Sequence, residues 1–276
     1  MTFGVVNNLR ITKNQKIRYL TILKQFFESL GYEKIDILKS KIVKKTSFFT
    51  IIGDSEEAEF IVATYYDTPV MSILRKRYEP FNDEMRKKQN STNYILSMIF
   101  LGMVLFLFNY FVALPVYQNG SFGVRTVIVG FLSLLLLTLI IKLSRMGGFP
   151  SFGNLIRNTS SVVAMLKFAN SLSPKERKKV AFVFVDYGCE DYLGYYALST
   201  SLNQSRKQKL IFLDCVGAGN IQKSKTKSSV LTAYFDHPLF VFGEFKKESK
   251  DYEAGIDACL SLLNKETFKK SKLVPD

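Results

Sequence analysis

The sequence predicts an α/β protein in which a mixed, mostly parallel β-sheet is sandwiched by helices and interrupted by a transmembrane helical hairpin. Two observations support this fold class. Apolar runs typical of strands alternate with stretches of helical periodicity, as in a parallel sheet covered by helices. Near the middle of the 276 residues, two longer apolar runs contain almost no charge. Such runs are typical of helices that cross a bilayer.

The two long apolar runs span residues 94–114 and 126–143, and neither holds a charge before Lys142. A helix of about 20 residues rises about 30 Å, which matches the hydrocarbon core of a bilayer. The alternative is a pair of buried helices in a soluble protein, which are seldom so long and so uniformly apolar. We therefore expect a hairpin at residues 92–145, between two parts of one domain at residues 1–91 and 146–276.

Basic residues predict the orientation of this hairpin. Two clusters, 75–77 and 86–88, precede the first span, and Lys142 and Arg145 close the second. The short link offers only Arg125. Positive charge collects on the cytoplasmic side of membrane proteins. The sequence therefore predicts a multi-pass protein of the cell membrane with both termini in the cytoplasm.

The net charge of +14 has two interpretations. It can serve anionic lipid head groups, at about 1 kcal/mol for each Lys or Arg near the surface, or it can serve nucleic acid. The clusters beside the spans favour the lipid bilayer and its anionic head groups as partners. We expect no nucleic acid, because no aromatic-basic stacking motif supports it. Three cysteines are too few and too scattered for a disulfide framework.

Before the hairpin, the sequence predicts one helix and two strands. Residues 13–30 carry apolar side chains at helical spacing, and Gly31 stands where a helix commonly ends. Residues 48–52 form an apolar strand, followed by a turn at Gly53 and Asp54. Residues 59–64 form a buried strand that ends just before Asp67.

After the hairpin, strands and helices alternate again. We expect helices at 154–170, 192–202 and 252–263, and strands at 179–185, 210–214, 229–235 and 239–242. Sites in parallel sheets lie beyond the carboxyl ends of strands. Asp67, the segment after Val185, and Asp214 all fall at such ends.

Four short motifs occupy these positions in a fixed order. They read Thr64-Tyr-Tyr-Asp67, Arg157-Asn-Thr-Ser-Ser161, Asp186-Tyr-Gly-Cys-Glu-Asp-Tyr-Leu-Gly194 and Leu213-Asp-Cys-Val-Gly217. Their order and spacing resemble the zinc-dependent aminopeptidases of the co-catalytic two-zinc type, over about residues 10–220 apart from the hairpin. The resemblance implies a zinc-exopeptidase-like fold with its site at these strand ends.

The departures from that family's pattern concern the metal ligands. The family has a His in the first motif, and Tyr65 stands there. The family bridges its two zincs with an Asp, and Arg157 occupies that position, followed by Asn158. The family's last motif contributes an Asp, which Asp214 keeps.

The family's Glu-Glu pair supplies a general base and a ligand. Without a gap, that pair falls on Gly188 and Cys189. A shift of one residue places it on Cys189 and Glu190, which keeps only the ligand. His237 is the single histidine and precedes a predicted strand, where we expect a turn residue.

A two-zinc site is therefore not expected. Two adjacent zinc ions need an anion between them, and a guanidinium stays positively charged. The sequence predicts no catalytic residue, no metal ligand and no cofactor, zinc included. What remains is a degenerate site at Tyr65, Asp67, Arg157, Asn158, Cys189, Glu190 and Asp214.

Several roles stay open for these residues. Arg157 is expected to form an ion pair with Asp67 or Asp214 in place of the metals. It can instead bind the carboxylate of a peptide. Cys189 with His237 as nucleophile and base, and one magnesium or calcium ion on Asp67, Glu190 and Asp214, are weaker alternatives.

The function expected from the resemblance is binding. The chain would be a membrane-anchored, non-catalytic aminopeptidase-like protein, a pseudoenzyme that holds a peptide or a membrane-protein partner at the cytoplasmic membrane face. Its cleft would open beside the membrane, with segment 70–91 as a basic collar, in a bacterial machine for export, processing or immunity. The alternative is an active, membrane-tethered metallopeptidase with altered ligands.

Overall fold

The computed structural model describes residues 9–42, 45–71, 78–118, 123–151, 155–202, 208–244 and 252–268. Contacts divide the chain into two compact units. The first, here called the α/β unit, comprises residues 1–69, 77–87 and 152–276. The second, the helical unit, comprises residues 70–76 and 88–151.

A seven-stranded mixed sheet forms the centre of the α/β unit as described, in the order β1-β2-β4-β3-β5-β7-β6. The strands are β1 (Ile35–Ile42), β2 (Lys45–Ile52), β3 (Phe60–Tyr65), β4 (Val180–Val185), β5 (Lys209–Asp214), β6 (Ile221–Ser224) and β7 (Leu239–Gly243). The four neighbours β4, β3, β5 and β7 run parallel. The outer pairings are antiparallel. The predicted α/β class with a mixed sheet is confirmed.

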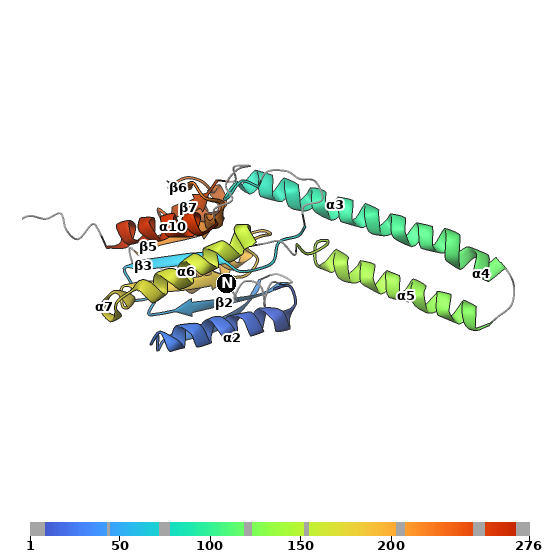
Figure 1. Ribbon diagram of the computed structural model, residues 1–276, viewed down its shortest axis with the longest axis horizontal. Coiled ribbons are helices and arrows are strands. Elements are labelled where there is room, and N and C mark those ends of the chain that lie inside the picture. Colours follow the sequence, from blue (N-terminus) through green and yellow to red (C-terminus); the bar gives the residue numbers. More distant parts are fainter. Residues whose placement is uncertain are drawn as a thin grey trace, which may run out of the picture. The chain divides into compact units, whose positions relative to one another are not determined.

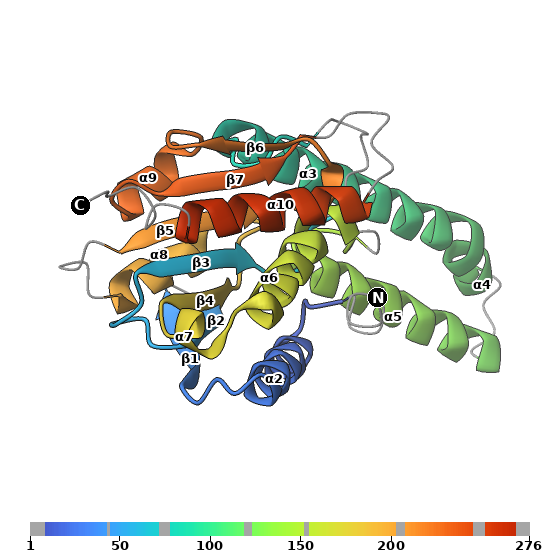
Figure 2. The ribbon, with the colours of Figure 1, turned by 60° about the vertical axis from the view of Figure 1, so that its left-hand side comes forward.

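Helices cover both faces of the sheet (Figure 2). One face packs against α2 (Lys13–Ser29), α6 (Ser160–Ser171) and α10 (Tyr252–Thr267) in one apolar cluster. The other face packs against α8 (Leu193–Ser201) and α9 (Ser229–Tyr234) in a second cluster. Val62 belongs to the first cluster and Ala63 to the second, because successive side chains of a strand point to opposite faces.

The order of the central strands creates a switch in direction beside β3. The chain runs from β3 to β4 on one side and then to β5 on the other side. Tyr65 pairs with Val185 of β4, and Ala63 pairs with Phe212 of β5. The carboxyl ends of all three strands therefore meet at one edge, where α/β proteins commonly bind their ligands.

Short helical turns complete this edge and the connections around it. They are the π-helix η2 (Leu155–Thr159), the 3₁₀-helix η3 (Val216–Ala218) and α7 (Pro174–Arg177). The predicted helix at 154–170 is observed as η2 and α6 together. Gly31, with φ of 85°, follows the last residues of α2, and Gly53, with φ of 86°, forms the predicted turn.

The helical unit contains two helices that are long and apolar enough to cross a membrane (Figure 1). The first helix, α3 (Asp83–Phe108), starts in the α/β unit and continues through the π-helix η1 (Asn109–Ala113) and α4 (Leu114–Gln118). The second is α5 (Val124–Arg145). Side chains such as Phe106 and Phe131 are 64% and 59% exposed. The apolar runs predicted as spans lie within these helices.

Four elements differ from what the sequence predicts. Residues 229–235 were expected as a strand but contain the helix α9, whose first N–H groups are capped by side chains. Ser228 Oγ accepts from Leu231 N at 3.1 Å, and Asp83 Oδ2 accepts from Val230 N at 3.1 Å. The edge strands β1 and β6 were not predicted, and α3 begins at Asp83 rather than near Tyr94.

Candidate functional site

The candidate site lies at the carboxyl ends of β3, β4 and β5. β3 ends in Tyr65 and leads to Asp67, the loop after β4 carries Asp186 to Tyr192, and β5 ends in Asp214. The π-helix η2 joins them, since Arg157 O accepts from Cys215 N at 2.9 Å. The four motifs that the sequence singled out are therefore adjacent in space.

The carboxylate of Asp214 is fully buried and is satisfied by protein donors. Tyr65 Oη donates to Asp214 Oδ1 at 2.5 Å, and Tyr78 Oη donates to Asp214 Oδ2 at 2.7 Å. Arg86 Nη2 lies 3.5 Å from the same Oδ2 and donates to Tyr78 Oη at 2.9 Å. Burial raises the pKa of both phenols well above its usual value, so they remain protonated donors.

Arg86 supplies the positive charge that balances Asp214. It is 3% exposed, and its guanidinium carbon lies 4.1 Å from the centre of the Tyr192 ring. It also donates to the backbone oxygen of Gly188. A buried ion pair is maintained only when further hydrogen bonds and packing compensate its desolvation. The aromatic rings and the Gly188 carbonyl provide that compensation here.

Arg157 does not form the predicted ion pair with Asp67 or Asp214 in the described part of the chain. Its guanidinium carbon stacks on the Tyr78 ring at 4.0 Å, and Nη2 donates to Cys189 O at 3.4 Å. Asp214 is already bonded to Arg86, and one phenol separates it from Arg157. The predicted pairing is wrong because the first turn of α3 delivers a different arginine.

Asp67 has a structural role in the loop after β4. Its Oδ1 accepts from Gly188 N at 2.9 Å, and its Oδ2 accepts from Cys189 N at 3.1 Å. Successive backbone N–H groups of this kind form a small anion-binding nest. The carboxylate is therefore held by the loop.

Asn158 connects the second motif to the first. Its Nδ2 donates to the backbone oxygen of Asp67, and its Oδ1 accepts from Arg10 Nη2 at 3.3 Å. Arg10 also donates to Thr159 Oγ1 at 3.1 Å and is 1% exposed. Asn158 is thus a buried connector between η2, β3 and the N-terminal segment.

A second buried ion pair lies next to Asp67. Lys16 Nζ of α2 is 2.7 Å from Asp186 Oδ1 and 2.8 Å from Oδ2. The pKa of Asp186 is raised to about 7: burial raises it most, Lys16 opposes the rise, and the Asp67 carboxylate adds to it. Burial also raises the pKa of Asp67, against the lowering effects of Lys16 and the two loop N–H groups.

Glu190 and His237 are not part of this site. Glu190 points to the surface, where Oε1 lies 2.9 Å from Lys45 Nζ. His237 has φ of 49° and is exposed in the turn before β7, so the predicted turn is confirmed. The turn adjoins the amino end of β7, whereas Cys189 follows the carboxyl end of β4, parallel to it. The two are separated by about 16 Å of strand and cannot act as nucleophile and base.

Cys189 is buried and inert in its surroundings. Its Sγ donates to the backbone oxygen of Asp67 at 3.3 Å. Burial raises the pKa of the thiol well above its usual value, and the Asp67 carboxylate raises it further. A thiol rather than a thiolate is therefore present, and the thiol is the weaker nucleophile. Among the described residues, no three His, Cys, Asp or Glu side chains are grouped so as to hold a metal ion.

Sequence reasoning missed Tyr78, Arg86 and Lys16. Arg86 was assigned to the basic collar, but its position in α3 gives a usable signal. Arg86, Gln89, Asn93 and Ser97 recur at helical spacing, and all four are buried. A polar stripe that extends a helix before an apolar run indicates a face turned away from lipid. Lys16 sits between apolar residues of α2, whereas Tyr78 gives no sequence signal.

Comparison with known proteins adds no family to these observations: no protein-family model matches the chain, and a search of curated proteins finds no match. Within the site, the two phenols and Arg86 already bond to Asp214, and the loop N–H groups bond to Asp67. Arg157 is the cation of the site that makes no ion pair with a described acidic residue, and an arginine suits the recognition of an anionic group.

Proposed function

We propose that this chain is a membrane-anchored, non-catalytic protein with a degenerate aminopeptidase-like site. It binds a peptide or a membrane-protein partner at the cytoplasmic face of the membrane. The resemblance of the four motifs is the basis for the aminopeptidase-like assignment. The two long apolar helices support the anchoring.

The observation that carries the proposal is the way the two retained carboxylates are used. Asp214 accepts from two phenols and an arginine, and Asp67 accepts from the backbone of the loop after β4. A carboxylate that binds zinc needs a free oxygen lone pair, and a two-zinc site also needs a bridging anion. In this site the oxygens already accept hydrogen bonds, and two guanidiniums lie nearby. Binding a metal would require breaking several buried hydrogen bonds, each of which stabilises by about 1 kcal/mol.

The binding group of the proposed site is Arg157. Six charged side chains are buried in the described residues, three basic and three acidic: Arg10, Lys16, Arg86, Asp67, Asp186 and Asp214. Arg157 is partly exposed and makes no ion pair with a described acidic residue. Its Nη2 makes a long hydrogen bond to a backbone carbonyl, and a carboxylate bound bidentately can replace that contact.

Metal content tests the non-catalytic part of the proposal. The full chain is purified in detergent without chelators and its metals are measured by mass spectrometry. We expect zinc far below one ion per chain in the wild type and no change in the Asp67→Ala/Asp214→Ala variant. Stoichiometric metal that is lost in this variant would instead support the active, membrane-tethered metallopeptidase.

Peptide binding tests the other part. A mixture of short peptides with free carboxyl termini is titrated into the purified protein, beside the same mixture with amidated termini. We expect the free carboxylates to bind more tightly, and Arg157→Gln to abolish the difference. Lys225→Gln, an exposed lysine elsewhere, is the control for charge. Equal binding of both mixtures to wild type would contradict the role of Arg157.

A further inference from the structure

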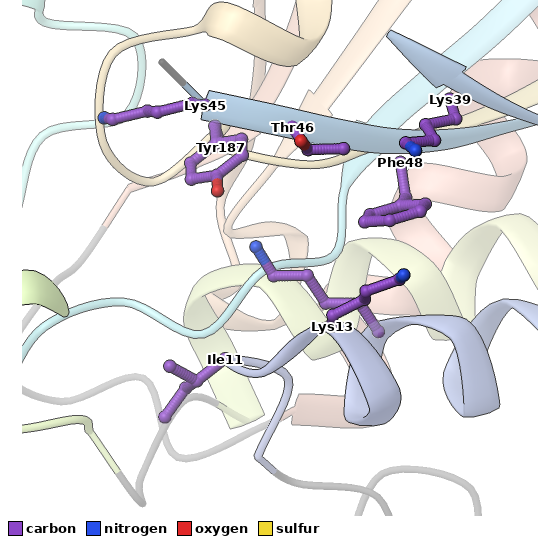
Figure 3. Close-up of a pocket in the computed structure, with 8 residues that line it drawn as sticks. Ile11, Lys13, Lys39, Lys45, Thr46, Phe48 and Tyr187 are labelled. Atoms are coloured by element: carbon purple, nitrogen blue, oxygen red, sulfur yellow. The ribbon is translucent and has the colours of Figure 1, made fainter. Parts of the chain in front are cut away.

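A second polar feature borders the strand-end site and shares Lys16 and the loop after β4 with it. It lies between the start of α2 and the strands β1 and β2 (Figure 3). It is a pocket of 340 Å³ within the α/β unit, lined by Ile11, Lys13, Lys16, Lys39, Lys45, Thr46, Phe48 and Tyr187. Its volume lies in the range of small-molecule sites, about 300–1,000 Å³. Four of the eight lining residues are lysines, and none is acidic.

The four lysines are not equivalent. Lys16 is paired with Asp186 and Lys45 with Glu190 and Asp191. Lys13 and Lys39 make no ion pair with a described acidic residue, and both are exposed. They come from opposite walls of the pocket, from α2 and β1 (Figure 3). These two side chains therefore provide uncompensated positive charge on both sides of the cavity.

The floor of the pocket is fixed rather than free to move. The Lys16 side chain is 7% exposed and held by both oxygens of Asp186. The ring of Tyr187 lies 4.1 Å from Lys16 Nζ and 5.1 Å from Lys45 Nζ. Tyr187 follows Asp186 directly and has φ of 55°, a backbone conformation uncommon for a large side chain. The loop after β4 thus places an aromatic ring between two ammonium groups.

Adjustable charge surrounds this fixed floor. The pairs of Lys45 involve side chains that are about half exposed, and such surface pairs contribute only about 0–1 kcal/mol. Lys45 can therefore turn toward a ligand at low cost. The first turn of α2, capped by Thr12 and Gln15, contains no acidic residue, so no carboxylate neutralises the positive end of the helix dipole.

We propose that this pocket binds a phosphate-bearing small molecule or head group with at least two negative charges. Lysine ammonium groups suit phosphate because they act as compact point charges, and Thr46 adds a hydroxyl donor. The described lining contains no arginine, so recognition of the anion rests on these point charges and not on a bidentate fork. Phe48 and Tyr187 form apolar walls for the part of the ligand that carries the phosphate.

The test uses inorganic pyrophosphate and the full chain in phosphatidylcholine nanodiscs, titrated calorimetrically at low salt. We expect saturable binding that weakens as salt is added, because screening reduces the attraction. The variant Lys13→Gln/Lys39→Gln should bind about tenfold or more weakly, since two charges near the ligand are lost. Its melting temperature should equal that of wild type, because both side chains are exposed.

Lys175→Gln/Lys225→Gln is the matched control: it removes the same charge from exposed positions outside the pocket. Its affinity for pyrophosphate should stay within about twofold of wild type. If both double variants bound pyrophosphate equally weakly, the loss of affinity would come from the net charge alone, and the proposal would be overturned. Absence of saturable binding to wild type would overturn it too.

A lipid arm identifies the source of the phosphate. The titration is repeated in nanodiscs that contain phosphatidic acid and in discs that contain phosphatidylglycerol, which differ in the charge of one phosphate group. If the apparent affinity for pyrophosphate falls with phosphatidic acid but not with phosphatidylglycerol, the lipid phosphate competes for the pocket, which is then assigned to a lipid head group. Equal affinities assign it to a soluble phosphate compound. The substituted residues, Lys13 and Lys39, differ from those of the metal and peptide tests, so a failure of this proposal is distinguishable from a failure of the proposed function.

Discussion

Buried charge at the ends of the central strands is arranged in separate pairs. Arg86 balances Asp214, Lys16 balances Asp186, and Asp67 is held by backbone N–H groups. Removing one partner from a buried pair leaves a charge without compensation, which costs far more than an exposed pair contributes. The two arginines of the site should therefore respond differently to substitution.

Arg86→Met should lower the free energy of unfolding by about 3–5 kcal/mol, because Asp214 loses its cation. Arg157→Met should cost about 2 kcal/mol or less, since only a stacking contact and a long hydrogen bond are lost. Chemical denaturation in detergent measures both. The double variant Arg86→Met/Asp214→Asn should cost less than the sum of its single variants. Equal losses for the two arginine variants would disprove this ranking.

Asp186 should make the stability depend on pH. Its pKa is about 7 in the folded state and 3.8 ordinarily, so the folded state binds the proton more tightly. Between these two values the free energy of unfolding therefore falls as pH rises, and the contribution is fully lost above about pH 7. Asp67, with its own raised pKa, adds to the same slope.

In Asp186→Asn we expect a shallower slope between about pH 5 and pH 7, together with a lower stability because Lys16 loses its partner. Denaturation curves across this range give the slope. Asp257→Asn, at an exposed position of α10, is the control and should keep the wild-type slope. An unchanged slope in Asp186→Asn would assign the pH dependence to other groups.

Most elements could be predicted because their signals are local. Periodic apolar residues in α2 and α6 and continuous apolar runs in β3, β4 and β5 have no competing interpretation. The helix α9 could not be predicted, because its apolar, partly β-branched sequence favours a strand. Asp83, distant in sequence, bonds to Ser228, Ser229 and Val230 and caps its first turn. The edge strand β1 was missed because its lysines blur the pattern.

The location of the site could also be predicted from local signals, but its internal contacts could not. The strand ends were located correctly, since parallel strands bring their carboxyl ends together, and Asp67, Arg157, Asn158, Cys189 and Asp214 do meet there. Which arginine pairs with which carboxylate depends on how far each side chain extends in the folded protein. The pairing of Asp214 with Arg86 rather than Arg157 is a contact over 128 positions, and nothing local in the sequence encodes it.

The loop after β4 depends on close packing at Gly188. A Cβ atom there would overlap the Cβ and ring of Tyr65. Gly188→Ala should therefore displace Tyr65 from Asp214 and cost about 1–3 kcal/mol, the usual effect of overpacking. Gly102→Ala in α3 is the control, because a Cβ there meets nothing within 4 Å. Equal melting temperatures for the two variants would contradict the packing at Gly188.

On the scale of the whole molecule, the α/β unit is discontinuous. Its sheet uses strands from before and after the helical unit, and the chain leaves after β3 and returns at η2. If both long helices cross the membrane, as we propose, both flanks of the hairpin lie on the same side. The basic flanking residues favour the cytoplasmic side.

Reporter fusions test this orientation. A fluorescent protein fused after Asp276 should fluoresce, and alkaline phosphatase inserted in residues 119–122 should be active outside the cytoplasm. With the two reporters exchanged, the phosphatase after Asp276 should be inactive and the fluorescent protein in residues 119–122 should not fluoresce. An active phosphatase at the C-terminus would reverse the orientation, and activity at neither position would argue against two spans.

The place of β3 in the sheet has a consequence during synthesis. Both of its neighbours, β4 and β5, are encoded after the hairpin. At about 5–20 residues per second, a ribosome needs on the order of ten seconds to reach them. During this delay an apolar strand is exposed and can aggregate. Nascent chains of this protein should therefore depend on chaperones until translation passes Asp214.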